Sequence, residues 1–125
     1  MIIAINNINN TLVDFSTKYG SARGNWKSNN NPYKKKYAVE FDYDGIITIE
    51  KISFCEKKYE INSVNNEITL CGKIIEIDDS SLLLYIGDTI ILFAISNECY
   101  KKFKVNDYVC IKVPSLDLYD ENIPI

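Results

Sequence analysis

Short apolar runs separated by turn residues fill the second half of the chain, and they constrain its fold more than any other feature. The runs ITLCGKIIEID, LLLYI and TIILFAI lie between residues 68 and 95 and are rich in β-branched residues, as strands are. Turn residues separate them at Asp78-Asp79-Ser80-Ser81 and at Gly87-Asp88. Gly87 stands in the first turn position, which favours a type II′ hairpin. The sequence therefore predicts three consecutive strands in this half.

A short helix and a further strand follow these runs. Within and around NECYKKFK, residues 97–104, Ile95, Cys99 and Phe103 are spaced four apart, which gives the predicted helix one buried face. The run DYVCIKV predicts the next strand. This order resembles an OB-type barrel, in which a helix links the third and fourth strands. The resemblance covers residues 67–120 and implies an antiparallel barrel whose last strand pairs beside the first.

The first half of the chain predicts one helix and one loop before any strand. Leu12, Phe15 and Tyr19 form an apolar stripe over residues 10–19, which predicts a short amphipathic helix that Gly20 ends. Residues 20–35 are rich in glycine, serine and asparagine and predict a mobile loop that contains Trp26.

A hairpin and a strand are expected next. Alternation from Lys36 onward predicts a strand, Asp44-Gly45 predicts a two-residue hairpin turn, and residues 46–52 predict the returning strand. Residues 57–61 predict one more strand. We therefore expect a mainly β protein, either a β-barrel or an α+β fold with two short helices. Its OB-like half would carry an additional N-terminal helix and hairpin.

Length and composition favour one globular domain. The chain has 125 residues, 46% of them hydrophobic and 25% charged, which is ordinary for such a domain. We expect a single domain, residues 1–125, in three parts. These are a helix and mobile loop in residues 1–35, a hairpin plus strand in 36–62, and the OB-like half in 67–120.

Charge is uneven along the chain, although the net charge is only −3. Residues 1–62 carry nine basic and seven acidic side chains, whereas residues 63–125 carry five basic and ten acidic ones. Arg23 is the only arginine among 14 basic residues. Base readout and bidentate phosphate binding favour arginine, and an acidic total opposes polyanion binding. Sequence-specific nucleic-acid binding is therefore not expected.

Several catalytic classes are excluded by the residues that are missing. The chain has no histidine, so Ser-His-Asp and Cys-His catalysis cannot occur within it. Its five glycines form no phosphate-binding motif. Two carboxylate clusters could hold Mg²⁺, but strand alternation and a turn already explain their spacing. They are Glu40, Asp42 and Asp44, and Glu76, Asp78 and Asp79. We expect a non-enzymatic protein without metal or cofactor.

The cysteines and the N-terminal sequence predict a cytoplasmic protein. Cys55, Cys71, Cys99 and Cys110 form no CxxC pair, so we expect four reduced thiols and no bound metal. The apolar run after Met1 is too short for a secretion signal. No stretch is long enough to span a membrane, and no membrane partner is expected.

Lysines next to aromatic residues suggest a second function. Lys34, Lys35 and Lys36 stand among Trp26, Tyr33, Tyr37, Phe41 and Tyr43, a combination that single-strand-binding OB modules use. The simpler interpretation is a solvated lysine run beside core aromatics, and we favour it. Trp26 has two interpretations as well: it anchors a partner, or it pins its loop onto the domain.

In overall character, a small, acidic, β-rich chain without catalytic apparatus resembles the immunity proteins of bacterial polymorphic-toxin and contact-dependent growth inhibition systems. This resemblance implies binding and neutralisation of one cognate toxin, often a nuclease, and it carries over no residue roles. An OB-type single-stranded nucleic-acid-binding module and a metal-dependent enzyme are the alternatives. Acids near an aromatic anchor predict the partner-binding residues. These are Glu76, Asp78, Asp79, Asp117, Tyr119, Asp120, Glu121 and Trp26.

Overall fold

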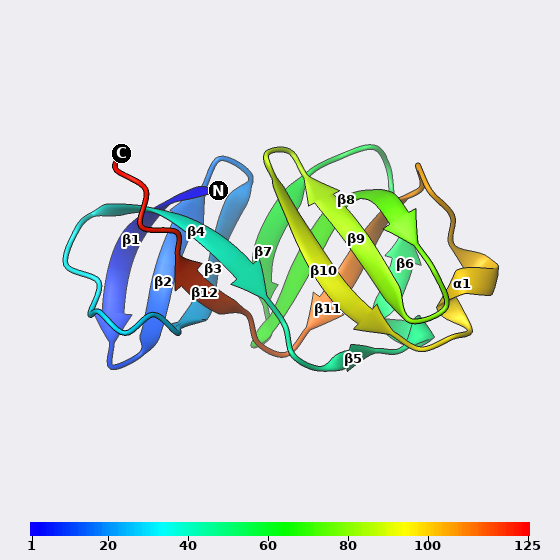
Figure 1. Cartoon of the computed structure of the whole chain (residues 1–125), viewed down its shortest axis with the longest axis horizontal. Helices are drawn as coiled ribbons and strands as arrows, with labels where there is room; N and C mark the ends of the chain where they lie inside the picture. Colours follow the sequence, from blue (N-terminus) through cyan, green and yellow to red (C-terminus); the bar gives the residue numbers. More distant parts are fainter.

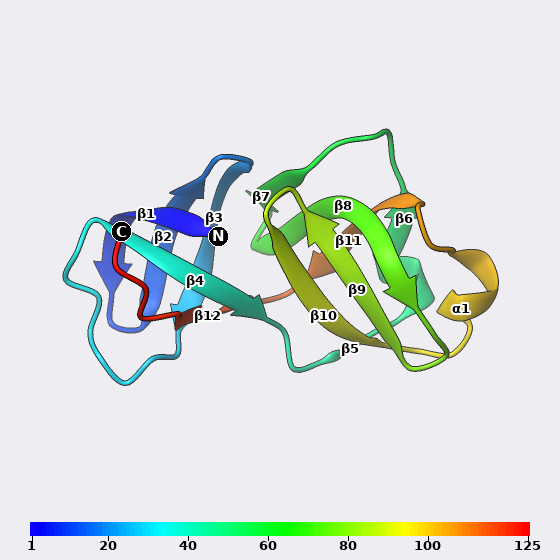
Figure 2. The same cartoon turned by 45° about the horizontal axis from the view of Figure 1, so that its top comes forward.

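The protein consists of two β units that lie side by side along its long axis (Figure 1). The computed structural model describes all residues, 1–125. One unit is a closed barrel, and the other is a curled sheet that carries a short helix at its far end (Figures 1 and 2). The expectation of a mainly β protein with an OB-like barrel is confirmed.

The first unit closes only with the last strand of the chain. Its strand order is β1-β2-β3-β12-β4, and β4 pairs back with β1. β12 runs parallel to β3 through Asn25 and Trp26, and antiparallel to β4. The strands are β1 (Ile2–Asn9), β2 (Leu12–Thr17), β3 (Gly20–Trp26), β4 (Lys36–Asp42) and β12 (Asp117–Asp120).

The helix predicted over residues 10–19 is wrong, because these residues form β2 and the turns on either side of it. Val13 and Phe15 point into the barrel, and Asp14 between them does not. Asn10 has φ +58° and forms, with Thr11, the two-residue turn between β1 and β2. The helical stripe of Leu12, Phe15 and Tyr19 was thus a coincidence within a strand of period two.

The mobile loop predicted over residues 20–35 is also wrong in its first part, which forms β3. Ala22, Gly24 and Trp26 alternate as buried residues, so the strand is amphipathic despite its small side chains. A Cβ at Gly24 would overlap Leu118 of β12, which shows how tightly β3 and β12 approach. Small residues are required there because Leu118 fills the interior.

The second unit has the sheet order β5-β10-β9-β8-β11-β6, with β7 paired to β8. The two ends of this order, β5 and β6, are neighbours in the chain, so the sheet curls round on itself. Its elements are β5 (Ile46–Ile47), the 3₁₀ turn η1 (Ile49–Lys51), β6 (Ile52–Phe54), β7 (Glu60–Val64), β8 (Glu67–Ile77), β9 (Ser81–Ile86), β10 (Thr89–Ile95), α1 (Cys99–Lys102) and β11 (Tyr108–Val113).

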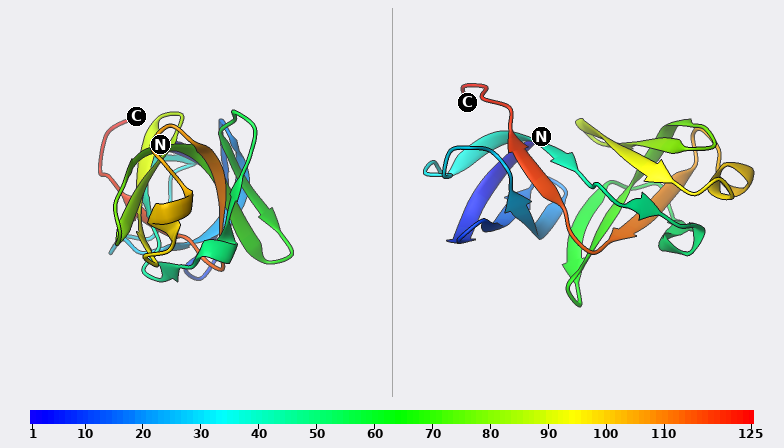
Figure 3. Two further views of the ribbon diagram at one scale, coloured as in Figure 1. Left: turned by 90° about the vertical axis from the view of Figure 1, so that its right-hand side faces the viewer. Right: turned by 60° about the horizontal axis from the view of Figure 1, so that its bottom comes forward.

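The expected order of strands and helix is confirmed in this unit. β8, β9 and β10 form consecutive hairpins, α1 follows, and β11 pairs with β8. Gly87 has φ +68°, as the first position of a type II′ turn requires. Ile95, Cys99 and Phe103 are buried, and α1 lies across one end of the unit (Figure 3).

Closure of the second unit differs from the expectation. The resemblance to an OB-type barrel implies that the last strand of residues 67–120 pairs beside the first, but that last strand, β12, belongs to the other barrel. Residues 46–54 take its place: β5 runs parallel to β10, and β6 pairs antiparallel with β11. The hairpin predicted at Asp44-Gly45 is therefore wrong. β4 pairs with β1 and β12, and these two residues carry the chain across to the second unit. Long-range pairing overrides local turn chemistry here.

A junction of glycines and tyrosines holds the two units together. The amide of Ile61 donates a hydrogen bond to the carbonyl of Tyr19, 3.1 Å away. Gly20 has φ +135°, and a Cβ there would overlap the Ile61 carbonyl. The Tyr59 ring meets those of Tyr19 and Tyr85, with centroids 5.8 and 5.6 Å away. The hydroxyl of Tyr108 and burial raise the pKa of Tyr59.

The prediction of four reduced cysteines is wrong for one pair. Cys71 of β8 and Cys110 of β11 lie opposite each other in the ladder, with Cα atoms 4.0 Å apart, and form a disulfide. Spacing in the sequence could not reveal this pair because strand pairing brings it together across 39 positions. Cys55 and Cys99 are free, and burial raises the pKa of the Cys55 thiol.

The junction predicts a strong glycine requirement at position 20. Gly20→Ala should lower the free energy of unfolding by more than about 2 kcal/mol, because φ +135° and the Ile61 carbonyl both exclude a side chain. Gly45→Ala is the matched control, since its Cβ would meet only the movable Tyr43 side chain. Urea denaturation measures both, and equal losses would contradict this role of Gly20.

The disulfide predicts a redox-dependent stability. It closes a loop of 39 positions, so the chain-entropy model gives about 4 kcal/mol. Reductant should lower the urea midpoint of the wild type but leave that of Cys71→Ser/Cys110→Ser unchanged. Cys55→Ser should respond to reductant like the wild type. Four free thiols in unfolded, non-reduced protein would contradict the disulfide.

Candidate functional site

The structure separates the two acidic groups that the sequence suggested as one binding surface. Glu76, Asp78 and Asp79 lie at the β8–β9 turn of the second unit, whereas residues 117–121 lie on and after β12 in the first. The two groups do not lie side by side, because β12 closes the first barrel, whereas an OB-type barrel would place it beside the first strand of the second unit.

Asp78 has a structural role in its turn. Its Oδ1 accepts hydrogen bonds from the amides of Ser80 and Ser81, at 2.9 and 2.7 Å. These bonds favour the charged carboxylate and hold the pKa of Asp78 below its ordinary value. Asp78 therefore stabilises the β8–β9 turn, and this contribution is lost as the pH falls through its lowered pKa.

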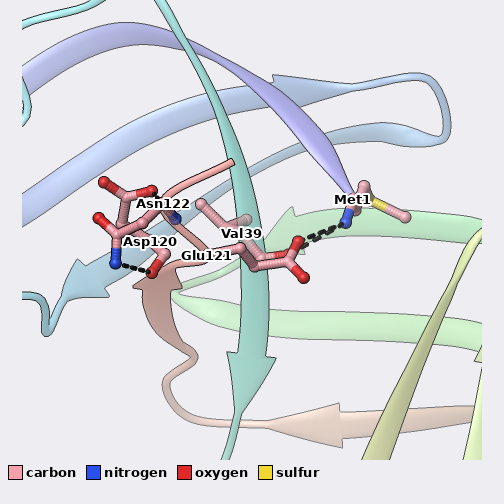
Figure 4. A network of polar contacts seen from close by, with 5 residues as sticks. All are labelled: Met1, Val39, Asp120, Glu121 and Asn122. Atoms are coloured by element: carbon pink, nitrogen blue, oxygen red, sulfur yellow. Dashed lines mark hydrogen bonds and ion pairs between the residues drawn. The ribbon is translucent and has the colours of Figure 1, made fainter. Parts of the chain in front are cut away.

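Asp120 and Glu121, two acids of the tail, make polar contacts within the first unit (Figure 4). Asp120 Oδ1 accepts the amide of Asn122 at 2.8 Å, and its Oδ2 lies 3.3 Å from the side-chain nitrogen of Asn30. The Glu121 carboxylate lies 3.7 Å from the amino group of Met1, which donates to the carbonyl of Val39 at 3.0 Å. Both acids thus have partners within the fold.

Trp26 lies inside the first barrel and is not a surface anchor. Its side chain is 5% exposed, and its ring contacts Tyr37 with centroids 4.9 Å apart. The indole N–H donates to the carbonyl of Asn30 at 2.7 Å, which ties down the following loop. Of the two interpretations of Trp26, anchoring a partner is therefore wrong, and pinning the loop is what the contacts show.

The structure forms a different acidic site, a cleft between the two units. β4 and β12 bound it on one side and the β9–β10 hairpin on the other, and its volume is about 690 Å³. Apart from the amino group of Met1, its charged groups are all carboxylates, those of Glu40, Asp42, Asp88 and Glu121. We call it the acidic cleft. Tyr119, one of the predicted contact residues, also lines it.

Most of these carboxylates have no cation beside them. The ion pairs of the fold involve Asp14, Glu60, Glu67 and Glu121, but not Glu40, Asp42 or Asp88. In the β4–β12 ladder, Asp42 stands directly opposite Asp117. Like charges at such positions are destabilising. The fold therefore tolerates concentrated negative charge here without gaining stability from it.

An exposed apolar face adjoins the acidic cleft. β9 and β10 turn one set of side chains inward and the other outward, yet both sets are apolar apart from the first residues, Ser81 and Thr89. Ile90 and Leu92, which also line the cleft, are 52% and 57% exposed. Ile46 of β5 lies beside Ala94 and is 67% exposed. We call this the outer apolar face. It comprises Ile46, Leu83, Tyr85, Ile90, Leu92 and Ala94.

The residues of the two alternative functions do not form comparable sites. No three carboxylate or cysteine side chains converge closely enough to hold a metal ion, so neither predicted acidic cluster forms one. Around the lysine run, Tyr37, Phe41 and Trp26 are buried in the first barrel and cannot stack on bases. Tyr33 alone is well exposed there, at 79%.

Another groove, of about 880 Å³, lies between β3 and the β7–β8 hairpin and is lined by a mixture of apolar side chains, amides and hydroxyls. Its charged residues, Asp14 and Arg23, pair with each other at 2.7 Å, which lowers the pKa of Asp14. This groove therefore offers no net charge to a ligand.

Sequence reasoning identified part of the acidic cleft but not its centre. Tyr119 and Glu121 were predicted contacts, and Glu40 and Asp42 were considered only as metal ligands. Ile90 and Leu92 were assigned only to a strand, although a run apolar on both faces indicates that something covers each face.

No helix of the chain has the length and apolar character needed to cross a bilayer. Comparison of the chain with protein-family models, curated proteins and solved structures found no match.

Substitutions of Asp42 and Asp78 should have opposite effects on stability, because Asp42 faces another acid whereas Asp78 accepts two backbone amides. Asp42→Lys should raise the free energy of unfolding by up to about 1 kcal/mol, because it replaces repulsion of Asp117 with attraction. Asp78→Ala should lower it, because two turn amides lose their acceptor. Urea denaturation near neutral pH measures both. A destabilised Asp42→Lys variant would show that this acid serves the fold.

Proposed function

We propose that the protein is a non-enzymatic binding protein that neutralises a basic partner, as an immunity protein neutralises its cognate toxin. One observation carries the proposal. Carboxylates without counter-ions line a cleft that continues into an exposed apolar face. That combination is typical of a protein interface with a desolvated apolar centre and a charged rim.

The charge of the acidic cleft favours a partner that normally binds a polyanion. A nuclease presents a positive site to its substrate, and a set of carboxylates can occupy that site in place of phosphates. Attraction between the two surfaces would also accelerate association at low salt. Glu40, Asp42 and Asp88 would supply this attraction, because none of them is neutralised within the fold.

The outer apolar face would supply most of the lasting contact. Ile90 and Leu92 are more than half exposed and sit at the border between cleft and face. Burying such side chains against a partner stabilises a complex by roughly 1.5–3 kcal/mol each. A nucleic acid offers no matching apolar surface for aliphatic side chains, so this face favours a protein partner over an oligonucleotide.

The proposal predicts that a gene next to this one encodes a toxin domain, and that domain is the partner for the test. The protein should bind that domain, block its activity at equal molar amounts, and show no turnover of its own. Glu40→Lys/Asp42→Lys should weaken binding roughly 100-fold, with much of the loss in the association rate at low salt. Leu92→Ser should weaken it roughly tenfold, mainly through faster dissociation.

The matched control is Glu76→Lys/Asp79→Lys, which makes the same charge change at the β8–β9 turn of the second unit. We expect its affinity to stay within about twofold of the wild type. Equal losses in both double variants would show a general charge effect and no defined site. Full binding by a folded Glu40→Lys/Asp42→Lys protein would reject the acidic cleft.

The expected cytoplasmic location remains a prediction. The Cys71–Cys110 disulfide weighs against it, because disulfides persist in oxidising compartments and are rare in the cytosol. Acid quenching of cells followed by thiol labelling reports the state of this pair in place. Two labelled cysteines from the four would favour an oxidising compartment, and four would favour the cytoplasm.

A further inference from the structure

In place of the expectation that no membrane is a partner, we propose that the end of the first barrel farthest from α1 binds the surface of an anionic lipid membrane. Lys34, Lys35 and Lys36 line one depression there, of about 450 Å³, together with Ile2 and Ile125. This end lies at the left of Figure 1, where the loop before β4 and the C-terminal segment come together. We call it the lysine pole. It is distinct from the acidic cleft and does not depend on the function proposed for that cleft.

The lysines of the pole are free to meet an external anion. None of the three takes part in an ion pair of the fold. The carboxylate in the adjoining depression, that of Asp120, is held by Asn30 and by the amide of Asn122. The three ammonium groups therefore form a local positive patch on a protein whose net charge is −3.

Aliphatic side chains stand among these lysines and are unusually exposed. Ile2 is 54% exposed, Ile123 52% and Ile125 57%. Lysines with exposed aliphatic side chains match the two parts of an anionic lipid interface, the charged headgroups and the apolar region beneath them. Neither these lysines nor these isoleucines belong to the core of the barrel.

Lipid fits this pole better than nucleic acid does. Base stacking needs exposed aromatic rings, but Tyr37 is buried. The ammonium group of Lys34 also lies over the rings of Tyr33 and Tyr37. Lys34 Nζ sits 6.0 Å from the ring centre of Tyr33 and 5.9 Å from that of Tyr37. Tyr33 is thus the one well-exposed aromatic ring there, and the other exposed apolar side chains around the lysines are aliphatic, which suits a bilayer better than a run of stacked bases.

The lysine pole and the acidic cleft lie at opposite ends of β4, so a membrane bound to the pole would not contact the cleft. β4 begins at Lys36 within the pole and ends at Asp42 in the cleft. Charge thus changes sign along a single strand of seven residues. A negative membrane surface would attract the first end of β4 and repel the other, which orients the protein on the bilayer.

Vesicle sedimentation of the full chain tests this proposal. The probes are vesicles of phosphatidylcholine alone, and vesicles of phosphatidylcholine mixed with phosphatidylglycerol. The wild type should bind only the anionic vesicles and should dissociate at high salt. Lys34→Gln/Lys35→Gln/Lys36→Gln should lose binding on the order of 100-fold, about fivefold for each lysine. Ile2→Ser should lose it roughly tenfold at each salt concentration at which the wild type still binds.

The matched control is Lys101→Gln/Lys102→Gln/Lys104→Gln, which removes three lysines at the opposite end of the molecule, on and after α1. Circular dichroism shows that each variant is folded. Equal losses in both triple variants, or no binding of the wild type to anionic vesicles, would overturn the proposal. Binding of a single-stranded oligonucleotide, lost in the first triple variant while vesicles stay unbound, would overturn it in favour of nucleic acid.

Discussion

The return of the last strand to the first barrel is the constraint on which the rest of the structure depends. β12 fills the gap between β3 and β4, and its Leu118 and the preceding Leu116 are fully buried. The second unit must then close without the tail, and residues 46–54 do so by joining β10 to β11. The chain crosses between the units twice, and the Gly20–Ile61 contact fixes them against each other.

This same closure creates the distribution of charge. Placing β12 beside β4 sets Asp117 opposite Asp42 and Tyr119 opposite Glu40, so two acidic segments far apart in the sequence become one surface. The junction then brings the β9–β10 hairpin up to that surface and adds Asp88 with two exposed aliphatic side chains. Lysines remain at the other end of β4. A fold selected for stability alone would not keep carboxylates opposite each other or isoleucines exposed to solvent. We therefore assign these surfaces to partners.

Local chemistry explains what the sequence could predict. β8 to β11 with α1 were predictable because strand periodicity, turn residues and the spacing of Ile95, Cys99 and Phe103 agree. β2 was missed because Leu12, Phe15 and Tyr19 also fit a helix. β3 was missed because its small residues are explained only by Leu118, which comes from the far end of the chain. Each acid of the cleft could be recognised in the sequence, but their grouping depends on the position of β12. The burial of Trp26, which was one of the predicted partner anchors, depends on β12 as well.

Hydrogen exchange of the complex with the cognate toxin domain that the proposed function predicts tests the central claim most directly, because it maps the contact without any substitution. The account predicts slower exchange on binding in residues 38–42, 88–94 and 117–121, the segments that form the acidic cleft and its apolar border. Exchange in the β8–β9 turn and in the groove between β3 and β7 should stay unchanged. Protection confined to those last two regions, with none in the acidic cleft, would contradict the account.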